Sequence, residues 1–353
     1  MSVPFKTLVI RFSSIGDIVL SMPLLRVLRA KFPDGQIDYL TKKEYAELVR
    51  TNHSLNVTHE YDATTGFEGL RALKERLKAE RYTHVIDIHN SIRSRYVRRG
   101  LGTNRVCTLD KRIVERTMLV KLKKNIYKDI VSVADRYIEA ASPLGLVNDG
   151  RGLELHIPDE ILFGVSARVA RLRLNRFEKV LGICPGAKHA TKRWLPDRFA
   201  QLAVRFCREH DGAVMLFGGA DDASLCAGIA ATIQAESGSE RVFDLSATLS
   251  LLENAAAMQF CDVVVTNDTG LMHIAVAMGR KTVAIFGSTV REFGFFPLSA
   301  QSIVLERAGL ACRPCSHIGR SECPEKHFRC MKEISVDDTS NALRSMVQWR
   351  PAL

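Results

Sequence analysis

The sequence lacks any long apolar segment and any leader-like beginning. None of its apolar runs approaches the roughly 20 residues that a membrane-spanning helix requires. The first apolar run lies between Lys6 and Arg11, and no small-residue cleavage site follows it at the distance typical of a secretory signal. We therefore expect a cytoplasmic protein, whose charge also allows peripheral contact with the inner face of a membrane.

Motifs of several large protein classes are missing as well. There is no zinc finger, helix-turn-helix or RNP-type motif, and only Tyr96 and Tyr127 lie among the clustered basic residues, which argues against a surface that stacks single-stranded nucleic acid. The first strand-to-helix turn, residues 13–18, has no Gly-x-Gly-x-x-Gly. A nucleotide-dependent oxidoreductase or epimerase would carry that fingerprint there, so this class remains only as an alternative.

Acidic residues are the scarcer charge, with 39 Asp and Glu against 50 Lys and Arg and a formal net charge of +11. This excess favours an anionic partner. Basic residues gather in the first half of the chain, at Arg93, Arg95, Arg98, Arg99, Lys111, Arg112, Lys121, Lys123 and Lys124. A phosphorylated substrate, an anionic membrane surface and a solvated face without a partner all fit this pattern, whereas the missing motifs lead us to expect no nucleic acid.

Apolar strand candidates alternate with amphipathic helices in two series. In the first series we expect strands at 7–10, 36–40 and 83–89, and in the second at 179–184, 213–217, 242–245, 262–266 and 282–286. Such alternation is typical of βαβ units with a parallel sheet. The sequence therefore predicts an α/β chain of two doubly wound, Rossmann-like domains, 1–156 and 157–335. We expect a final helix within 336–353 to pack back toward the N-terminal domain.

Asp17 lies in the first turn of the helix that follows the opening strand. A carboxylate at a helix N-terminus is stabilised by the helix dipole and stays ionised near neutral pH. Taken alone, this acid fits a helix cap at least as well as a chemical role. The choice between the two depends on the rest of the chain.

Three turns of the second series carry residues suited to an anionic ligand. In parallel α/β sheets, ligands bind at the carboxyl ends of the strands. Residues 185–196 combine Gly186 with Lys188, Lys192 and Arg193, residues 218–222 begin with two glycines, and residues 267–273 open a helix whose free amides suit a pyrophosphate. Each turn alone fits an exposed loop or a cap, but three on one sheet favour a phosphorylated ligand.

Several segments together resemble a known family. They are Arg11–Asp17 with Pro23, Asp87–Ser94, Pro185–Ala187 with Lys192–Trp194, Asn267–His273, and Cys312–Cys315 with Cys323-Pro324 and Cys330-Met331. In this order they resemble the ADP-heptose:lipopolysaccharide heptosyltransferases, glycosyltransferase family nine. The resemblance implies a GT-B fold, two Rossmann-like domains facing a central cleft, with the acceptor on the N-terminal domain and the nucleotide sugar on the C-terminal domain. It also implies catalysis without a metal or other cofactor.

The resemblance assigns roles to individual residues. Asp17 matches the general base of an inverting transfer of heptose, or a related sugar, from a nucleotide sugar, ADP-heptose being expected, to the lipopolysaccharide core. Lys192 matches the cation that stabilises the leaving diphosphate. The resemblance and the three turns together place at the donor Gly186, Lys188, Thr191, Arg193, Gly218, Gly219, Leu249, Asp268, Thr269, Gly270 and His273. Residues expected at the anionic, lipid-linked acceptor are Ser13, Ser14, Gly16, Asn90, Arg93 and Arg95, the region 93–99 being richer in arginine than in the family.

One departure from the family affects the predicted cation. Relatives have Pro directly after Trp, whereas here Leu195 separates Trp194 from Pro196, so Lys188 is the alternative to Lys192. Besides the oxidoreductase or epimerase, a nonenzymatic binder of anionic membrane or nucleic acid is the second alternative function, one that would survive Asp17→Ala unchanged.

Nine cysteines in a cytoplasmic protein should be mostly reduced. Five lie in apolar contexts and are expected in the core: Cys107, Cys184, Cys207, Cys226 and Cys261. The other four cluster as Cys312, Cys315, Cys323 and Cys330. Their spacing leaves open a structural zinc site and a set of free or redox-sensitive thiols.

Overall fold

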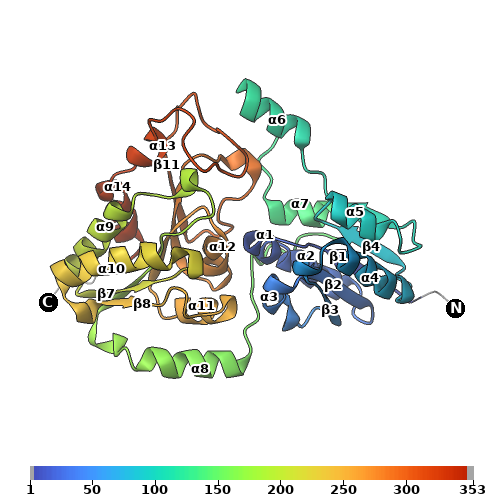
Figure 1. Ribbon diagram of the computed structural model, residues 1–353, viewed down its shortest axis with the longest axis horizontal. Helices are drawn as coiled ribbons and strands as arrows, with labels where there is room; N and C mark the ends of the chain where they lie inside the picture. Colours follow the sequence, from blue (N-terminus) through green and yellow to red (C-terminus); the bar gives the residue numbers. More distant parts are fainter. Residues whose placement is uncertain (1–3, 348–353) are drawn as a thin grey trace. The chain divides into compact units, whose positions relative to one another are not determined.

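The computed structural model describes residues 4–347 and divides into two compact units (Figure 1). The first unit is formed by the chain up to Ile113 together with Val131–His156, and the second by Val114–Ile130 and the chain from Ile157 onward. The main boundary therefore lies between His156 and Ile157. The segment Val114–Ile130 departs from the expected division, because it packs with the second unit.

The first unit contains a five-stranded parallel sheet of order β3-β2-β1-β4-β5. Its strands are β1 (Lys6–Ile10), β2 (Gln36–Lys42), β3 (Val57–Tyr61), β4 (His84–Asp87) and β5 (Val106–Thr108). In register, Thr7 of β1 lies opposite Ile37 on one side and His84 on the other. The central strand is buried along Thr7–Ile10, as its apolar run predicts.

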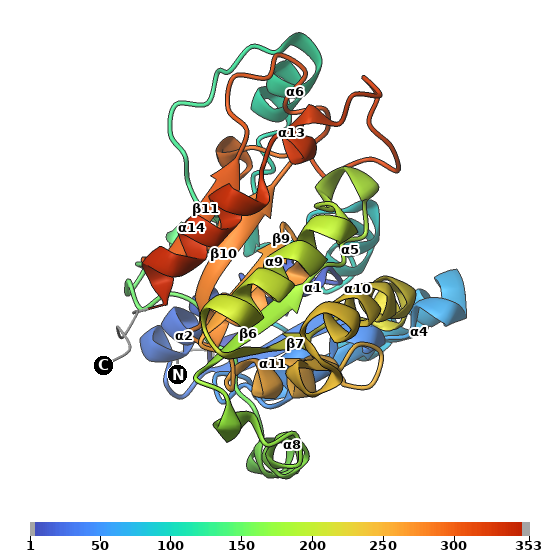
Figure 2. The same ribbon diagram turned by 90° about the vertical axis from the view of Figure 1, so that its left-hand side faces the viewer.

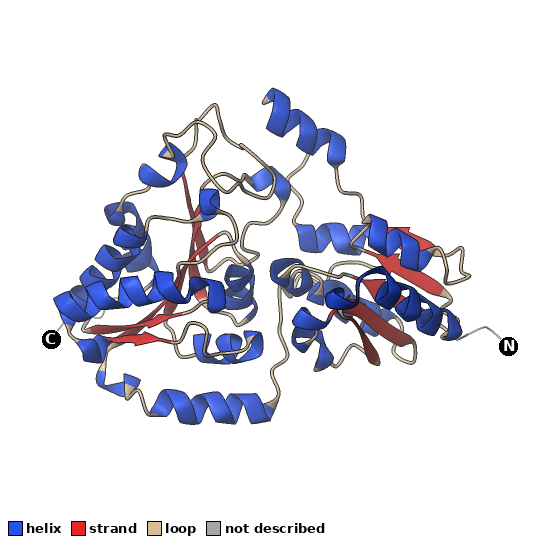
Figure 3. Ribbon diagram, viewed as in Figure 1, coloured by secondary structure: helices blue, strands red, loops and turns tan. Residues whose placement is uncertain are grey.

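Helices of the first unit cover this sheet. They are α1 (Ile15–Val19), α2 (Met22–Lys31), α3 (Glu47–Arg50), α4 (Gly66–Ala79), α5 (Ile92–Arg98) and α7 (Val133–Ala140). Helix α4 buries Leu70, Leu73 and Leu77, which recur at helical spacing, in a core shared with Leu8 and Ile10 of β1. Figure 3 shows the strands in red between the blue helices.

The second unit contains a six-stranded parallel sheet of order β11-β10-β9-β6-β7-β8. Its strands are β6 (Lys179–Cys184), β7 (Gly212–Leu216), β8 (Val242–Asp244), β9 (Val263–Asn267), β10 (Lys281–Phe286) and β11 (Ser302–Glu306). Its helices are α8 (Asp159–Ala170), α9 (Pro196–Glu209), α10 (Ala223–Ser237), α11 (Leu251–Met258), α12 (Gly270–Ala277), α13 (Arg329–Lys332) and α14 (Val336–Met346), and α6 (Ile113–Leu122) begins at the boundary.

One-turn 3₁₀ helices connect these elements. They lie at Lys43–Tyr45, Ala63–Thr65, Ser142–Leu144, Leu174–Arg176, Ala190–Lys192, Ala220–Asp222, Ser239–Arg241 and Arg291–Phe293. No helix within residues 4–347 combines the length and the apolar character that crossing a membrane requires.

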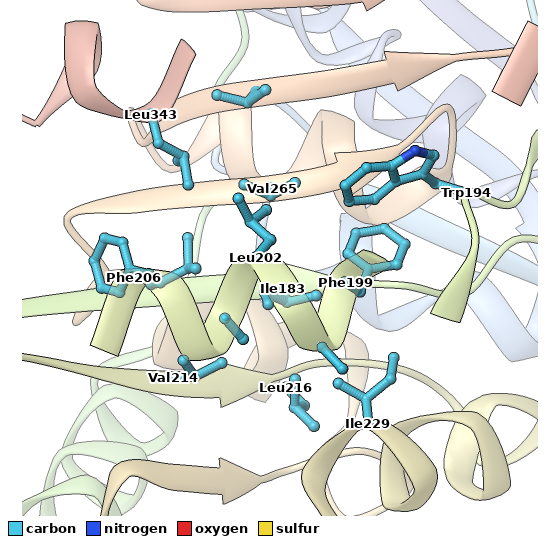
Figure 4. Packing of buried hydrophobic residues seen from close by; sticks show 14 of the residues in the cluster. Ile183, Trp194, Phe199, Leu202, Phe206, Val214, Leu216, Ile229, Val265 and Leu343 are labelled. Atoms are coloured by element: carbon cyan, nitrogen blue, oxygen red, sulfur yellow. The ribbon is translucent and has the colours of Figure 1, made fainter. Parts of the chain in front are cut away.

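The main core of the second unit lies between α9 and the sheet (Figure 4). Phe199, Leu202 and Phe206 of α9 belong to one buried cluster with Ile183 of β6 and Val265 of β9. Trp194 stacks edge-on against Phe199, with ring centroids 4.9 Å apart. This packing fixes the start of α9 and therefore the turn that precedes it.

The expectation for the C-terminal helix is wrong over Val336–Met346. Helix α14 packs on α9, β10 and β11 of the second unit, and Figure 2 shows it beside α9. The reason is its apolar face: Ala342 and Leu343 join the core of that unit. Upstream of α14, Trp194 Nε1 donates to the Ile334 carbonyl at 3.0 Å. Residues 348–353 of the predicted segment lie outside the described residues.

Candidate active site

Each sheet has one point where the strand order reverses. In the first unit this point lies between β1 and β4, and in the second between β6 and β9. Ligands of doubly wound folds bind outside the carboxyl ends of the strands at such a point. The turns that follow these four strands contain the predicted residues Ser13–Asp17, Asn90–Arg95, Gly186–Arg193 and Asp268–His273.

Asp17 is held by contacts to both of its carboxylate oxygens. Oδ1 lies 2.6 Å from Arg11 Nη2 and accepts a hydrogen bond from the Tyr137 hydroxyl at 3.1 Å. Oδ2 accepts from the Ser14 hydroxyl at 2.8 Å and from the Ser14 N–H at 3.2 Å. Asp17 therefore also closes the capping box of α1, so the capping interpretation is correct for this residue.

The charge of Asp17 is stabilised by its surroundings. Burial opposes ionisation, but the Arg11 guanidinium and the Ser14 hydrogen bonds outweigh it, so the pKa of Asp17 lies below its usual value. The Asp17 side chain retains 14% exposure and Ser14 is exposed. Ser14, which binds Oδ2, is thus the solvent-exposed neighbour of this carboxylate.

The turn after β4 is organised by a second acid, Asp87, which is fully buried. Its Oδ1 accepts from the backbone N–H groups of the two residues before Ser91, at 3.1 and 2.7 Å, and its Oδ2 lies 2.9 Å from Arg98 Nη1. Asn90 Nδ2 donates to the Leu109 carbonyl at 2.8 Å. The predicted acceptor residue Asn90 thus also holds its own turn.

The predicted arginines of α5 lie at the surface. Arg93 and Arg95 are exposed, and Arg95 Nε donates to Asn90 Oδ1 at 3.0 Å. Sequence reasoning missed the neighbouring His89. Burial, together with the charges of Arg11 and Lys111, lowers the pKa of His89 to about 3, so this imidazole is neutral at physiological pH.

In the second unit, Lys192 and Asp268 form an ion pair, which we call the second-unit ion pair. Lys192 Nζ lies 2.7 Å from Asp268 Oδ2, and both side chains are largely buried. The Thr289 hydroxyl donates to the same Oδ2 at 2.7 Å. The structure therefore brings together the predicted cation and the predicted acid, which are far apart in the sequence.

Asn267, which sequence reasoning did not single out, joins the two turns at the switch point. Its Oδ1 accepts from the Trp194 N–H at 2.9 Å, and its Nδ2 donates to the Pro185 carbonyl at 2.7 Å. Asn267 is fully buried. The sequence signal that could have identified Asn267 is its position as the last residue of the apolar strand β9. From the end of that strand its amide reaches the turn after β6.

The glycines differ in what surrounds them. A Cβ on Gly186 would lie 2.1 Å from Asp222 Oδ1, and one on Gly218 would lie 2.7 Å from Asp222 Cβ, whereas Gly219 has open space. Asp222 Oδ2 accepts from the Gly219 N–H at 3.1 Å. The Asp222 carboxylate therefore covers Gly186, whereas the space next to the Gly219 Cα is open.

Of the other residues predicted to bind the nucleotide sugar, two are held by hydrogen bonds and two differ in their exposure to solvent. Thr191 and Arg193 stabilise their own loop: Thr191 Oγ1 accepts from the Arg320 N–H at 2.8 Å, and Arg193 Nε donates to the Ala187 carbonyl at 2.6 Å. Lys188 is exposed, and Leu249 is half-buried. Lys192 is therefore the lysine of this turn that the fold holds in place.

Thr269 is the N-cap of α12, but its side chain does not cap the helix. The Thr269 Oγ1 atom is buried and has no hydrogen-bond partner among the described residues. His273 lies one turn further along and is 2% exposed. Backbone N–H groups at Gly270 and beyond form the helix N-terminus that an anion would approach.

The five cysteines expected in the core include four that are buried and one, Cys107, that is half-buried. Burial raises the pKa of Cys207 to about 11, which makes it a poor nucleophile. Within residues 4–347, no three His, Cys, Asp or Glu side chains stand in an arrangement that could hold a metal ion.

Comparison with known proteins gives this geometry a context. Residues 70–326 match Glycosyltransferase family 9 (heptosyltransferase). Lipooligosaccharide heptosyltransferase 2 of Campylobacter jejuni is 33% identical over 178 residues, which cover 50% of this chain and about half, 54%, of that relative. Lipooligosaccharide heptosyltransferase 2 of Haemophilus ducreyi is 26% identical and matches over 97% of this chain and 99% of its own length.

A solved structure supports the GT-B-like fold. The E. coli ADP-heptose lps heptosyltransferase II superposes with a TM-score of 0.73 at 23% identity, covering 97% of this chain and 98% of that one. At that identity the likeness concerns the fold. The family match, which spans well over half of the chain, decides the assignment. The chain belongs to glycosyltransferase family 9, the heptosyltransferases.

Proposed function

We propose that the protein is an inverting, metal-independent heptosyltransferase that moves a heptose from ADP-heptose to the lipopolysaccharide core. The observation that carries this proposal is an ionised carboxylate, Asp17, held at the carboxyl end of β1, where its charge is stabilised by Arg11. The heptosyltransferase relatives support the sugar and the acceptor, and the similar E. coli ADP-heptose lps heptosyltransferase II supports the adenine nucleotide.

In the proposed reaction, Asp17 accepts the proton of an acceptor hydroxyl as its oxygen attacks the anomeric carbon. The bond between that carbon and the diphosphate oxygen breaks, and the configuration inverts. Asp17 is a weak base because its pKa is lowered, but the hydroxyl becomes strongly acidic as the new C–O bond forms. A positioned carboxylate therefore suffices for general base catalysis.

On the donor side, Lys192 stabilises the negative charge that develops on the leaving diphosphate. A buried cation already fixed by Asp268 needs little reorganisation when that charge appears. The free N–H groups at the start of α12 add to this stabilisation. Gly219, with open space around it, allows the nucleotide to approach the backbone.

We also propose peripheral contact with the inner face of the inner membrane by a cytoplasmic enzyme. The segment 113–130 exposes apolar side chains and lysines together: Ile113, Val114, Leu122, Ile126, Ile130, Lys121, Lys124 and Lys128. Exposed apolar groups beside cations suit the headgroup region of an anionic leaflet. This placement would bring the enzyme to a lipid-linked, phosphate-bearing acceptor.

The experiment is a transfer assay with ADP-heptose, other nucleotide sugars and truncated lipopolysaccharides. We expect ADP release that depends on the acceptor, and an acceptor whose mass increases by one heptose. Release of no nucleotide with any donor would contradict the proposal. Charge-driven binding without turnover would then favour a nonenzymatic binder, and a redox change in an added dinucleotide would favour an oxidoreductase.

A further inference from the structure

Four cysteines that the proposed function does not use line one pocket of the second unit. We call it the thiol pocket, and its wall includes His327, Ser288, Cys312, Cys315, Cys323 and Cys330. Cys312, Cys315 and Cys323 lie in the loop between β11 and α13, Cys330 lies in α13, and all four are free thiols. Four sulfur donors around one space are the ligand set of a tetrahedral zinc or iron site.

The imidazole of His327 is the other candidate ligand of this pocket. Its Nε2 lies 3.8 Å from Cys312 Sγ. Its Nδ1 accepts a hydrogen bond from the Arg329 N–H at 3.0 Å. A neutral ring that accepts at Nδ1 carries its proton on Nε2, whereas a metal-binding histidine donates through its second nitrogen. His327 therefore fits a hydrogen-bond donor to the Cys312 sulfur better than a metal ligand.

Ser288 provides a second possible donor in the same pocket. Ser288 is 1% exposed, and its Oγ has no hydrogen-bond partner among residues 4–347. A buried hydroxyl without a hydrogen-bond partner destabilises the fold unless a bound group supplies the missing partner. A thiolate sulfur in the pocket would accept from it. The imidazole N–H and the hydroxyl thus both suit negatively charged sulfur.

We infer that the four cysteines of the thiol pocket bind one zinc ion as thiolates, with His327 and Ser288 donating hydrogen bonds to the sulfur atoms. Binding exchanges four S–H protons for Zn²⁺ and gives a tetrathiolate centre of charge −2, with no oxidation or reduction. As they lie, no three of these side chains could hold a metal ion, so zinc binding requires the thiols to turn toward one another. Arg320, whose Nε donates to the Cys315 carbonyl at 3.1 Å, offsets part of the negative charge.

The site would also order the second-unit ion pair. On one side, the Arg320 N–H donates to Thr191 Oγ1 at 2.8 Å, directly before the lysine of the pair. On the other side, Arg313 Nη2 donates to the Thr289 carbonyl at 2.6 Å, and the Thr289 hydroxyl binds the carboxylate of the pair. A zinc ion that closes the cysteine loop thus holds both partners of the pair in place.

The test is the metal content of the full chain, purified in reductant without chelator and measured by mass spectrometry of the elements. We expect close to one zinc ion per chain. Cys312→Ser and Cys330→Ser should lose most of the zinc, and the matched control Cys107→Ser, outside the pocket, should keep it. His327→Ala should keep the ion but bind it about 10- to 100-fold more weakly in a chelator competition, and His327→Gln, which can still donate, should restore much of that loss.

Removal of zinc from the wild type by chelator gives a second readout that does not depend on how a variant folds. The thermal midpoint should fall and recover when zinc is added back. Metal-free chains with freely titrating thiols, intramolecular disulfides in the intact mass, or iron in place of zinc would each overturn the inference. None of these measurements needs a substrate, so the inference and the proposed transferase function can fail separately.

Discussion

At the scale of the residue, Asp17 combines a structural and a proposed chemical role on one side chain. Oδ2 completes the cap of α1, and Oδ1 is bound by Arg11 and Tyr137. The two roles are compatible because the contacts that hold the carboxylate also keep it ionised. The same contacts make its basicity dependent on its neighbours, which can be measured.

Tyr137→Phe should move the acidic limb of the pH profile of kcat/KM to higher pH. The Tyr137 hydroxyl donates to Asp17 Oδ1, and loss of a donor to a carboxylate raises its pKa. Because the ionised base is the active form, activity should then decline at a higher pH than in the wild type. Tyr39→Phe is the matched control, since the buried Tyr39 hydroxyl is paired with Ser21. If the acidic limb lies at the same pH in Tyr137→Phe and Tyr39→Phe, the positioning role of Tyr137 is contradicted.

Lys192→Ala should weaken ADP binding and turnover, and it should also destabilise the second unit. The substitution leaves Asp268, which is 5% exposed, without its cation, and breaking a buried pair in this way costs about 3–5 kcal/mol. The exposed Lys188 provides the control, because Lys188→Ala should leave the free energy of unfolding nearly unchanged. Calorimetric ADP titration and urea unfolding measure both effects. Loss of ADP binding only in Lys188→Ala would identify Lys188 as the donor cation.

At the scale of the element, helix α14 is part of the second core. Leu343 is 2% exposed there, so Leu343→Ala should reduce the free energy of unfolding by about 2–5 kcal/mol. Asp337→Asn on the same helix breaks a pair with Arg205 in which Asp337 is 78% exposed, and we expect a change of less than about 1 kcal/mol. Urea denaturation measures the free energy of unfolding of both variants. Similar small losses in both would show that α14 does not contribute to the core.

Elements and turns differ in how far the sequence predicts them. The strands β1, β6 and β9 are predicted by apolar runs, and small or polar residues such as Gly, Ser, Asp and Asn mark the turns after them. Local sequence was therefore enough to single out Asp17 and the turn that contains Lys192. The contacts of Tyr137 with Asp17 and of Asn267 with Pro185 join residues far apart in the chain. No local pattern contains such a contact, and the packing side of α14 likewise depends on the tertiary core.

At the scale of the whole molecule, the net charge of +11 predicts salt-dependent association with anionic lipid. Sedimentation with anionic vesicles should be strong at low salt and largely lost at about 0.5 M salt. Lys121→Glu with Lys124→Glu should weaken it at least about tenfold. Lys123 is left intact because its Nζ donates to the carbonyls of Cys312 and Pro314. Binding that is indifferent to salt and to both substitutions would contradict membrane contact by segment 113–130.

The most direct test of the proposed catalysis is the transfer rate of Asp17→Asn with ADP-heptose and a truncated lipopolysaccharide. Asparagine keeps an acceptor for the cap of α1 but cannot take a proton. We predict a rate about 10²- to 10⁴-fold below that of the wild type, with ADP binding close to that of the wild type. The thermal midpoint should fall, because the buried Arg11 loses its carboxylate partner. Transfer at the wild-type rate by a folded, ADP-binding Asp17→Asn would contradict the role of Asp17 as the base.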